Sequence, residues 1–286
     1  DGIEVRAHAL YSEQPLWTYA GPLSAGGRDS RTIPFQDYVE TSFMNNNGGT
    51  LARSLQHAAT IGGGRVLVAL LDANRRTSDN TFDGIRINPA IPTRSLHCVD
   101  FATGARVWTQ RRPELGRDAF ENRVSILSPP LVVSDRVYAI GTVLEGAINC
   151  FALCFALDDG RLLWRTPIAV GQQELTMFNK PFKEFSIQSP SERDGALFFC
   201  TNLGLIASVD TLSGQLRWIS QYDSVPIISS QNYMRINERS TNWENDPPIL
   251  ANGVCVVAPL DSHDFMGFDV STGKRLWQKS FNDSQH

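Results

Sequence analysis

The sequence predicts an all-β fold assembled from repeated, four-stranded antiparallel sheets. A turn-and-strand motif with the pattern Asp-x-x-Thr/Ser-Gly-x-x-x-Trp occurs three times in full, and a fourth stretch keeps its glycine and tryptophan. No stretch combines apolar residues at helical spacing with capping residues. Short strands repeated at a fixed interval are typical of the blades of a β-propeller. The final tryptophan recurs every 54 to 59 residues, at Trp108, Trp164, Trp218 and Trp277.

The motif at residues 209–218 predicts a strand end, a tight turn and a second strand. The carboxylate of Asp210 is placed to accept hydrogen bonds from backbone N–H groups of the turn. Gly214 supplies the positive φ that lets the chain reverse. Apolar and polar residues then alternate up to Trp218, which is the spacing of a half-buried strand.

Other stretches repeat this motif. Residues 99–108 and 268–277 match it position by position, whereas residues 155–164 carry Ala156 in place of the aspartate. Residues 5–17 are a degraded half-unit in which Glu13 stands where glycine is expected. The repeat therefore predicts about four and a half blades in a single propeller domain or propeller segment, 1–286. We expect a half-blade at 1–20, a loop at 21–53, and blades at about 54–112, 124–168, 186–222 and 246–280.

Each later unit opens with a short strand headed by proline, as at Ser128-Pro129-Pro130 and Asp246-Pro247-Pro248. Because proline lacks an N–H donor, this position fits an innermost or edge strand. The glycine run at 62–64 is typical of a turn, since no Lys-Ser/Thr follows it as in a phosphate-binding loop. We interpret residues 72–94 as a polar insertion within the first unit.

Composition excludes several classes of protein. The chain has 286 residues, 42% hydrophobic and 20% charged, which is ordinary for a globular protein. A formal net charge of −4 gives no electrostatic basis for binding nucleic acid. The arginine pairs at 75–76 and 111–112 are interpreted as solvated loops. No run of eighteen apolar residues predicts a transmembrane segment. The start at Asp1, without a signal-peptide pattern, is expected from a processed or shortened chain.

Five cysteines cannot all be paired in disulfides. Cys98 and Cys154 each precede the motif tryptophan of their unit by the same interval, which predicts buried strand positions where cysteine acts as a small hydrophobic residue. Cys150 and Cys154 share a strand face but do not form the Cys-x-x-Cys of a zinc or redox site. We therefore expect structural, reduced thiols.

The Asp-x-x-Thr/Ser-Gly-x-x-x-Trp hairpins resemble the tryptophan-docking motif of quinoprotein-type propellers. That superfamily contains pyrroloquinoline-quinone (PQQ) dehydrogenases and cofactor-free relatives such as the propeller lipoprotein of the outer-membrane assembly machine. The stretches 171–178, 183–185 and 201–204 are similar to long, planctomycete-type PQQ-like propeller proteins. The resemblance covers about residues 54–280 and the initial half-unit.

The resemblance implies that each motif tryptophan packs against the neighbouring blade, and a large ring is well suited to covering the joint between two flat sheets. It also implies rings of seven or eight blades. We therefore expect this chain to be part of a larger ring or an open arc that self-associates or leans on further blades. The expected blade-docking residues are Asp100, Gly104, Trp108, Gly160, Trp164, Asp210, Gly214, Trp218, Asp269, Gly273 and Trp277.

Quinone enzymes of this superfamily use a vicinal cysteine pair, a calcium site of Glu, Asn and Asp, and a tryptophan stacked on the quinone. This sequence has no Cys-Cys pair. The segment Trp243-Glu244-Asn245-Asp246 offers a stacking ring beside potential calcium ligands, but a solvated loop is the favoured interpretation. We therefore assign no catalytic, cofactor-binding or metal-binding residue. The histidines His8, His57, His97 and His263 have no metal-site spacing and are interpreted as surface or satisfied strand residues.

Aromatic and basic residues alternate between Glu174 and Phe185, a composition that can bind peptides, bases or sugars. A long loop between blades that pins its apolar side chains onto the ring explains the same residues and is the favoured alternative. The tentative ligand-binding loop residues are Phe178, Lys180, Phe182, Lys183, Trp243 and Glu244.

These observations favour a non-enzymatic propeller scaffold that binds protein or another macromolecule in the periplasm, in the cell envelope or outside the cell. Two alternatives stay open, because a fold by itself does not set function. One is a fragment of a PQQ-dependent dehydrogenase, with PQQ and Ca²⁺ as its cofactors. The other is the sensor ectodomain of a membrane receptor.

Overall fold

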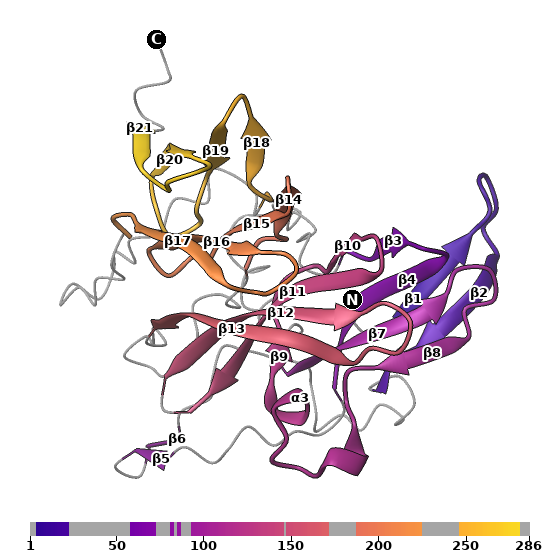
Figure 1. Cartoon of the computed structure of the whole chain (residues 1–286). Helices are drawn as coiled ribbons and strands as arrows, with labels where there is room; N and C mark the ends of the chain where they lie inside the picture. The colour runs from indigo at the N-terminus through magenta and orange to yellow at the C-terminus, as the bar shows by residue number, and fades with distance from the viewer. Residues whose placement is uncertain are drawn as a thin grey trace, which may run out of the picture.

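The computed structural model describes residues 4–22, 58–72, 81–82, 85–86, 93–145, 147–171, 187–224 and 246–280. Within these ranges, four antiparallel sheets, each built around four strands that pair in chain order, follow one another along the chain (Figure 1). We call them blades 1 to 4 in chain order. Blade 1 consists of β3 (Thr60–Gly62), β4 (Arg65–Leu71), β7 (Arg94–Asp100) and β8 (Arg106–Thr109). Blade 2 consists of β10 (Leu131–Val133), β11 (Arg136–Leu144), β12 (Ile148–Ala156) and β13 (Leu162–Gly171). Blade 3 consists of β14 (Ser191–Arg193), β15 (Ala196–Cys200), β16 (Leu205–Asp210) and β17 (Leu216–Gln221). Blade 4 consists of β18 (Ile249–Ala251), β19 (Val254–Val257), β20 (Asp264–Asp269) and β21 (Arg275–Ser280).

The remaining elements are short. A two-stranded hairpin, the half-blade, pairs β1 (Glu4–His8) with β2 (Pro15–Ala20) beside blade 1. The connection between β4 and β7 contains the pair β5 (Thr81–Phe82) and β6 (Ile85–Arg86). Between blades 1 and 2 lie the 3-10 helix η2 (Pro113–Leu115), the single-turn α3 (Phe120–Arg123) and β9 (Ser125–Ile126).

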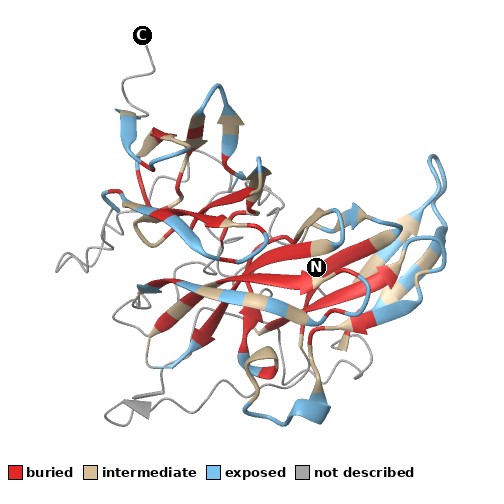
Figure 2. Ribbon diagram, in the orientation of Figure 1, coloured by how far each residue is buried: buried red, intermediate tan, exposed pale blue. Residues whose placement is uncertain are grey.

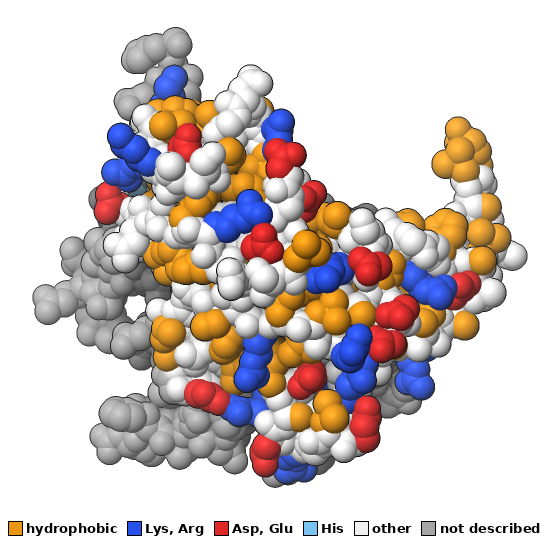
Figure 3. Space-filling model, viewed as in Figure 1, with side chains coloured by type: hydrophobic (Ala, Val, Ile, Leu, Met, Phe, Trp, Pro, Cys, Tyr) orange, Lys and Arg blue, Asp and Glu red, His pale blue; other side chains and the backbone are white. Residues whose placement is uncertain are grey.

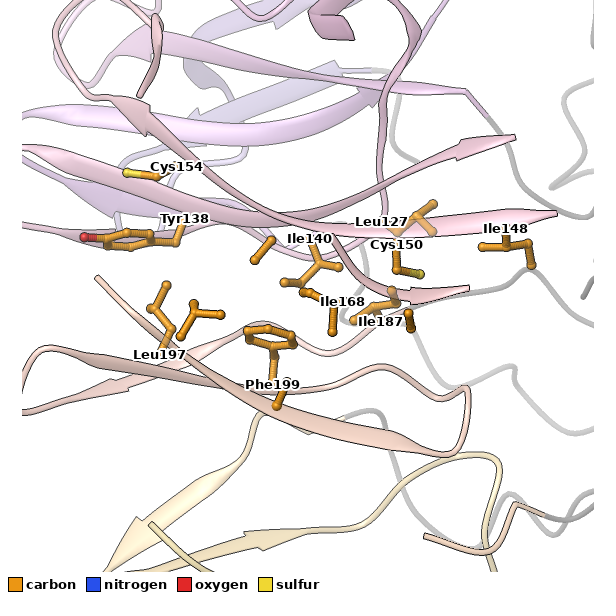
Figure 4. Packing of buried hydrophobic residues seen from close by; sticks show 14 residues of the cluster. Leu127, Tyr138, Ile140, Ile148, Cys150, Cys154, Ile168, Ile187, Leu197 and Phe199 are labelled. Atoms are coloured by element: carbon orange, nitrogen blue, oxygen red, sulfur yellow. The ribbon is translucent and has the colours of Figure 1, made fainter. Parts of the chain in front are cut away.

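The hydrophobic core lies between the blades, because each flat sheet buries its faces against its neighbours (Figure 2). Three apolar clusters fill the joints between blades 1 and 2, 2 and 3, and 3 and 4. Figure 4 shows the second cluster, in which Tyr138, Ile140 and Cys150 of blade 2 face Leu197 and Phe199 of blade 3. The innermost strands also meet, since the Thr60 hydroxyl donates to the carbonyl of Pro130 in the next blade.

Because the strands of each blade are antiparallel and pair in chain order, the connections between them lie at two opposite ends of the blade. Within every blade, the first and third connections are short turns at one end, which we call the turn end. The second connection, and the link to the next blade, lie at the opposite end, which we call the connection end. The described strands that flank each long link have their linked ends at the connection end; the links are 21–59, 72–93, 110–124, 172–190 and 222–248. The turn end is therefore uniform and the connection end is variable.

These sheets confirm the predicted all-β fold class. One strand was not predicted, and two local interpretations were wrong. Strand β9, which pairs with β11, was not predicted. Arg94 was placed in a polar insertion but begins β7 and is 3% exposed. Arg111 was expected in a solvated loop, but its guanidinium is largely buried against the carboxylate of Asp72, which offsets the cost of removing the charge from water.

Candidate functional site: the blade-docking motif and the connection end

The motif turns are closed by their own aspartates. The Asp210 carboxylate accepts hydrogen bonds from the backbone N–H groups of Leu212 and Ser213, and from the Ser213 hydroxyl. The hydrogen bond from Arg217, followed by those from Ser213, holds the pKa of Asp210 well below its usual range. Gly214 has a φ of 70°, as the turn requires. Asp100 and Asp269 close their turns in the same way.

Each motif turn, whether or not it carries the aspartate, receives a tryptophan from the preceding blade or half-blade. The indole N–H of Trp108 in blade 1 donates to the carbonyl of Leu157 in blade 2, at 2.8 Å. Its ring lies on Gly160, where any Cβ would collide with it. A hydrogen bond and a ring contact thus fasten one blade to the next. The same two contacts join Trp17 to Phe101 and Gly104, Trp164 to Thr211 and Gly214, and Trp218 to Val270 and Gly273.

A second feature of this motif is a small residue opposite each tryptophan, which was recognised from the sequence only at Cys98 and Cys154. The residue directly across the sheet from each tryptophan is small: Cys98 faces Trp108, and Ser208 faces Trp218. A small side chain leaves room for the ring to reach the neighbouring blade. The signal is in the sequence, ten positions before each tryptophan, where Ala7, Cys98, Cys154, Ser208 and Gly267 occur.

Blade 2 departs from the motif because Ala156 cannot close its turn with a carboxylate. In blade 1, Arg65 pairs with the motif aspartate Asp100. The corresponding residue of blade 2, Arg136, has no such partner and extends to blade 3, where it donates to the carbonyl of Leu212 at 3.1 Å. In blade 2, the ion pair with the motif aspartate is therefore replaced by a hydrogen bond from Arg136 to blade 3.

Within the described residues, Trp277 contacts its own blade, and its expected docking role stays a prediction. Its ring packs over Gly267 of its own sheet and meets the Phe265 ring edge to face. No further blade follows β21 within the described residues, so its ring has no glycine turn to contact there. Trp277 contributes to blade 4 itself.

The five thiols are buried and unpaired in the structure. Burial raises the pKa of Cys98 and Cys154 to about 11, and that of Cys150, Cys200 and Cys255 to about 12. The thiolate is the reactive form, and shifts of this size lower its population about 100-fold or more near pH 8. The folded protein is therefore expected to react with Ellman's reagent at least about 100-fold more slowly than free cysteine. Five thiols per chain should react once guanidinium unfolds it. Rapid labelling of the folded chain would contradict this burial.

At the connection end, blade 4 is tied to blade 3 through a buried carboxylate. Asp261, 1% exposed, accepts hydrogen bonds from the Gly204 N–H at 2.8 Å and the Tyr222 hydroxyl at 2.7 Å. Burial, followed by the neighbouring Cys200 and Asp261, raises the pKa of Tyr222 well above its usual value. An open hollow of about 420 Å³ lies beside this link, bordered by the end of β17 and by Arg275. The ends of these loops are thus held in fixed positions.

The tentative ligand residues fall outside the described residues: Phe178, Lys180, Phe182, Lys183, Trp243 and Glu244. Their predicted role stays a prediction.

The described residues do not fit a PQQ and calcium site. Their thiols are buried within sheets, and they contain no group of three or more acidic, histidine or cysteine side chains placed to hold a metal ion. Of the potential calcium ligands beside Trp243, Asp246 lies within the described residues, and it is exposed just before β18. We derive no chemistry through this cofactor.

Comparison with known proteins agrees with this geometry. Residues 153–285 match the family model described as outer membrane protein assembly factor BamB. Quinohemoprotein alcohol dehydrogenase from Comamonas testosteroni is similar in structure, with a TM-score of 0.53 and 15% identity, over 94% of this chain and 38% of the dehydrogenase. The chain therefore has a β-propeller fold, and the family match covers somewhat less than half of its residues. At this identity, the structural likeness establishes the fold alone.

Two further solved structures resemble this chain with lower TM-scores. BamB from Moraxella catarrhalis gives a TM-score of 0.32 at 15% identity, over 67% of this chain and 61% of BamB. A quinohemoprotein alcohol dehydrogenase from Pseudomonas putida gives a TM-score of 0.46 at 16% identity, over 78% of this chain and 34% of the enzyme. The chain thus spans less than two thirds of each of these three proteins. No curated protein matches its sequence. Within the described ranges, no helix is long and apolar enough to cross a membrane.

Proposed function

We propose that this chain is a non-enzymatic scaffold of the cell envelope that binds protein through the connection end of its blades. The observation that carries the proposal is the asymmetry between the two ends. The turn end repeats one closed motif, whereas every long link joins strand ends at the connection end. Rigid sheets that present variable loops on one side are the usual architecture of a binding surface.

Two features support protein as the partner. The link from Asp261 to Gly204 and Tyr222 fixes the loops of blades 3 and 4 relative to each other, which lowers the entropy cost of binding. On the face drawn in Figure 3, acidic and basic side chains are interspersed with apolar ones. A mixed surface of this kind is better suited to binding a protein than to binding a polyanion such as a nucleic acid.

The envelope location is supported by the match of residues 153–285 to a family described as an outer membrane protein assembly factor. Periplasmic, surface-attached and secreted forms of the chain all agree with this match. Fractionation of cells that produce the protein would separate these locations.

Site-specific photocrosslinking tests the proposed surface. A photoreactive amino acid is placed at the exposed connection-end positions Arg117, Asp118 and Asp223, and at the matched turn-end positions Ala102, Ser213 and Ser271. Illumination of intact producing cells is expected to give discrete protein adducts from the connection end, at least about tenfold stronger than from the turn end. Equal labelling from both ends, or none from the connection end, would overturn the assignment.

A second measurement separates the scaffold from a dehydrogenase fragment. The purified chain is titrated with PQQ and Ca²⁺, and dye-linked alcohol oxidation is followed in the same samples. The scaffold proposal predicts no stoichiometric binding and no oxidation above a heat-denatured control. Binding of one quinone per chain would overturn the scaffold proposal even without turnover.

A further inference from the structure

The joint between the half-blade and blade 1 differs chemically from the other joints. In blades 2, 3 and 4, the residue just before the one that faces the motif tryptophan is apolar and belongs to the cluster shared with the preceding blade. This residue is Leu153 in blade 2, Ala207 in blade 3 and Met266 in blade 4. The same position in blade 1 holds His97, which is only 4% exposed. A titratable side chain thus replaces an apolar one at this joint.

Tyr19 of the half-blade meets this histidine. Trp17 and Tyr19 are half-buried on one face of β2, whereas the residues between and beside them are exposed. Trp17 makes the usual docking contact with blade 1. The Tyr19 hydroxyl oxygen lies 2.9 Å from Nδ1 of His97, and the two rings lie 5.7 Å apart. In the blade 2 and blade 3 tryptophan strands, the residue two positions after the tryptophan is Thr166 or Ser220, which bonds a turn carbonyl instead.

The hydrogen bonds continue from His97 to Ser95 and Asp72, and the donor and acceptor of each bond are fixed. The Ser95 hydroxyl donates its one proton to Asp72. Its oxygen, 3.0 Å from Nε2 of His97, must therefore accept from Nε2–H. Nδ1 of the neutral ring is then free to accept from Tyr19. Arg111 completes the chain by donating to Asp72 at 2.6 Å and 3.0 Å.

The surroundings oppose a second proton on the imidazole. Burial, the largest effect, lowers the pKa of His97 to about 4; Asp72 raises it, and Arg106 of β8 and Arg111 lower it further. Arg94 lies buried on the same strand as His97. A protonated ring would also donate from Nδ1, toward a hydroxyl that now donates to it.

We propose that this hydrogen-bonded joint is an acid-sensitive latch, in which protonation of His97 releases the half-blade from blade 1. The attached state keeps His97 neutral, whereas release exposes the ring and returns it to an ordinary pKa near 6.5. Because the released state binds the extra proton, attachment is complete above about pH 6.5 and weakens as the pH falls toward 4. The weakening approaches tenfold per pH unit over this window.

Hydrogen–deuterium exchange of the whole chain at pH 7.5, 6.5, 5.5 and 4.5, corrected for the intrinsic pH dependence of exchange, tests the latch. An isolated two-stranded hairpin is marginally stable, so release lowers the protection of the β1 and β2 amides. We expect this protection to fall by up to about tenfold per unit below pH 6.5. Strands β15 and β16, whose joint with blade 2 is apolar, serve as an internal control and should stay constant.

Two variants assign the effect to the proposed groups. His97→Gln cannot be protonated in this range and should give β1–β2 protection that is independent of pH. Tyr19→Phe removes the bond to Nδ1 but retains the imidazole, so protection should be lower at pH 7.5 and still depend on pH. The latch is refuted if wild-type β1–β2 protection follows that of β15–β16 at every pH, a comparison that needs no variant. Persistent pH dependence in a folded His97→Gln protein would refute it as well.

Discussion

Replacing Trp218 by alanine is expected to lower the free energy of unfolding by about 3–5 kcal/mol, the range for truncating a large aromatic side chain in a core. The ring is 8% exposed, lies on Gly273 of blade 4 and donates to the carbonyl of Val270 at 2.9 Å. Its removal leaves a cavity in the joint and an unsatisfied carbonyl. Urea denaturation followed by circular dichroism measures the loss.

Trp277→Ala is the matched control, since it removes the same side chain from the same motif position. This ring contacts Gly267 and Phe265 of its own blade. Without a joint to open, its loss should cost about 1–2 kcal/mol, an ordinary value for a partly buried residue. Equal costs for the two variants would mean that docking between blades adds nothing to stability.

The second large effect is expected at the glycines that receive these rings. Gly160→Ala places a methyl group into the Trp108 ring and a side chain at a φ of 68°. Left-handed backbone costs about 1–2 kcal/mol and overpacking about 1–3 kcal/mol, so we expect a total loss of about 2–5 kcal/mol.

Gly64→Ala separates the two contributions. Gly64 has a φ of 70°, but a Cβ there would meet nothing within 4 Å. Its substitution should cost only the backbone share, about 1–2 kcal/mol. If Gly160→Ala lowers the free energy of unfolding by no more than Gly64→Ala does, the Trp108 ring can move away from the new methyl group at no cost, and the ring contact does not contribute to stability.

The blades and their turns could be predicted from the sequence because those signals are local. The aspartate, glycine and tryptophan of the motif lie within ten residues of one another, and each acts through backbone geometry or strand alternation. The burial of Cys98 and Cys154 followed from their repeated position and agrees with the structure.

The parts that could not be predicted depend on contacts between distant segments. Asp72 and Arg111 are far apart in the sequence, and each alone resembles a solvated loop residue. His97 was interpreted as a surface or satisfied strand residue, and nothing near it in the sequence indicates that Tyr19 lies against its ring. The contacts of Trp277 with Gly267 and Phe265 depend on the packing of blade 4, which its motif does not encode.

The central claim is that the tryptophan of one blade is fastened to the glycine turn of the next. A double-mutant cycle between Trp108→Ala and Gly160→Ala, with Trp108→Ala and Gly214→Ala as the reference cycle, measures this most directly. Without the ring, Gly160→Ala should cost only about 1–2 kcal/mol, as Gly64→Ala does, which gives a coupling energy of about 1–3 kcal/mol. The reference pair, which shares no contact, should be additive within about 0.5 kcal/mol. Additivity in both cycles, or equal coupling in both, would contradict the docking account.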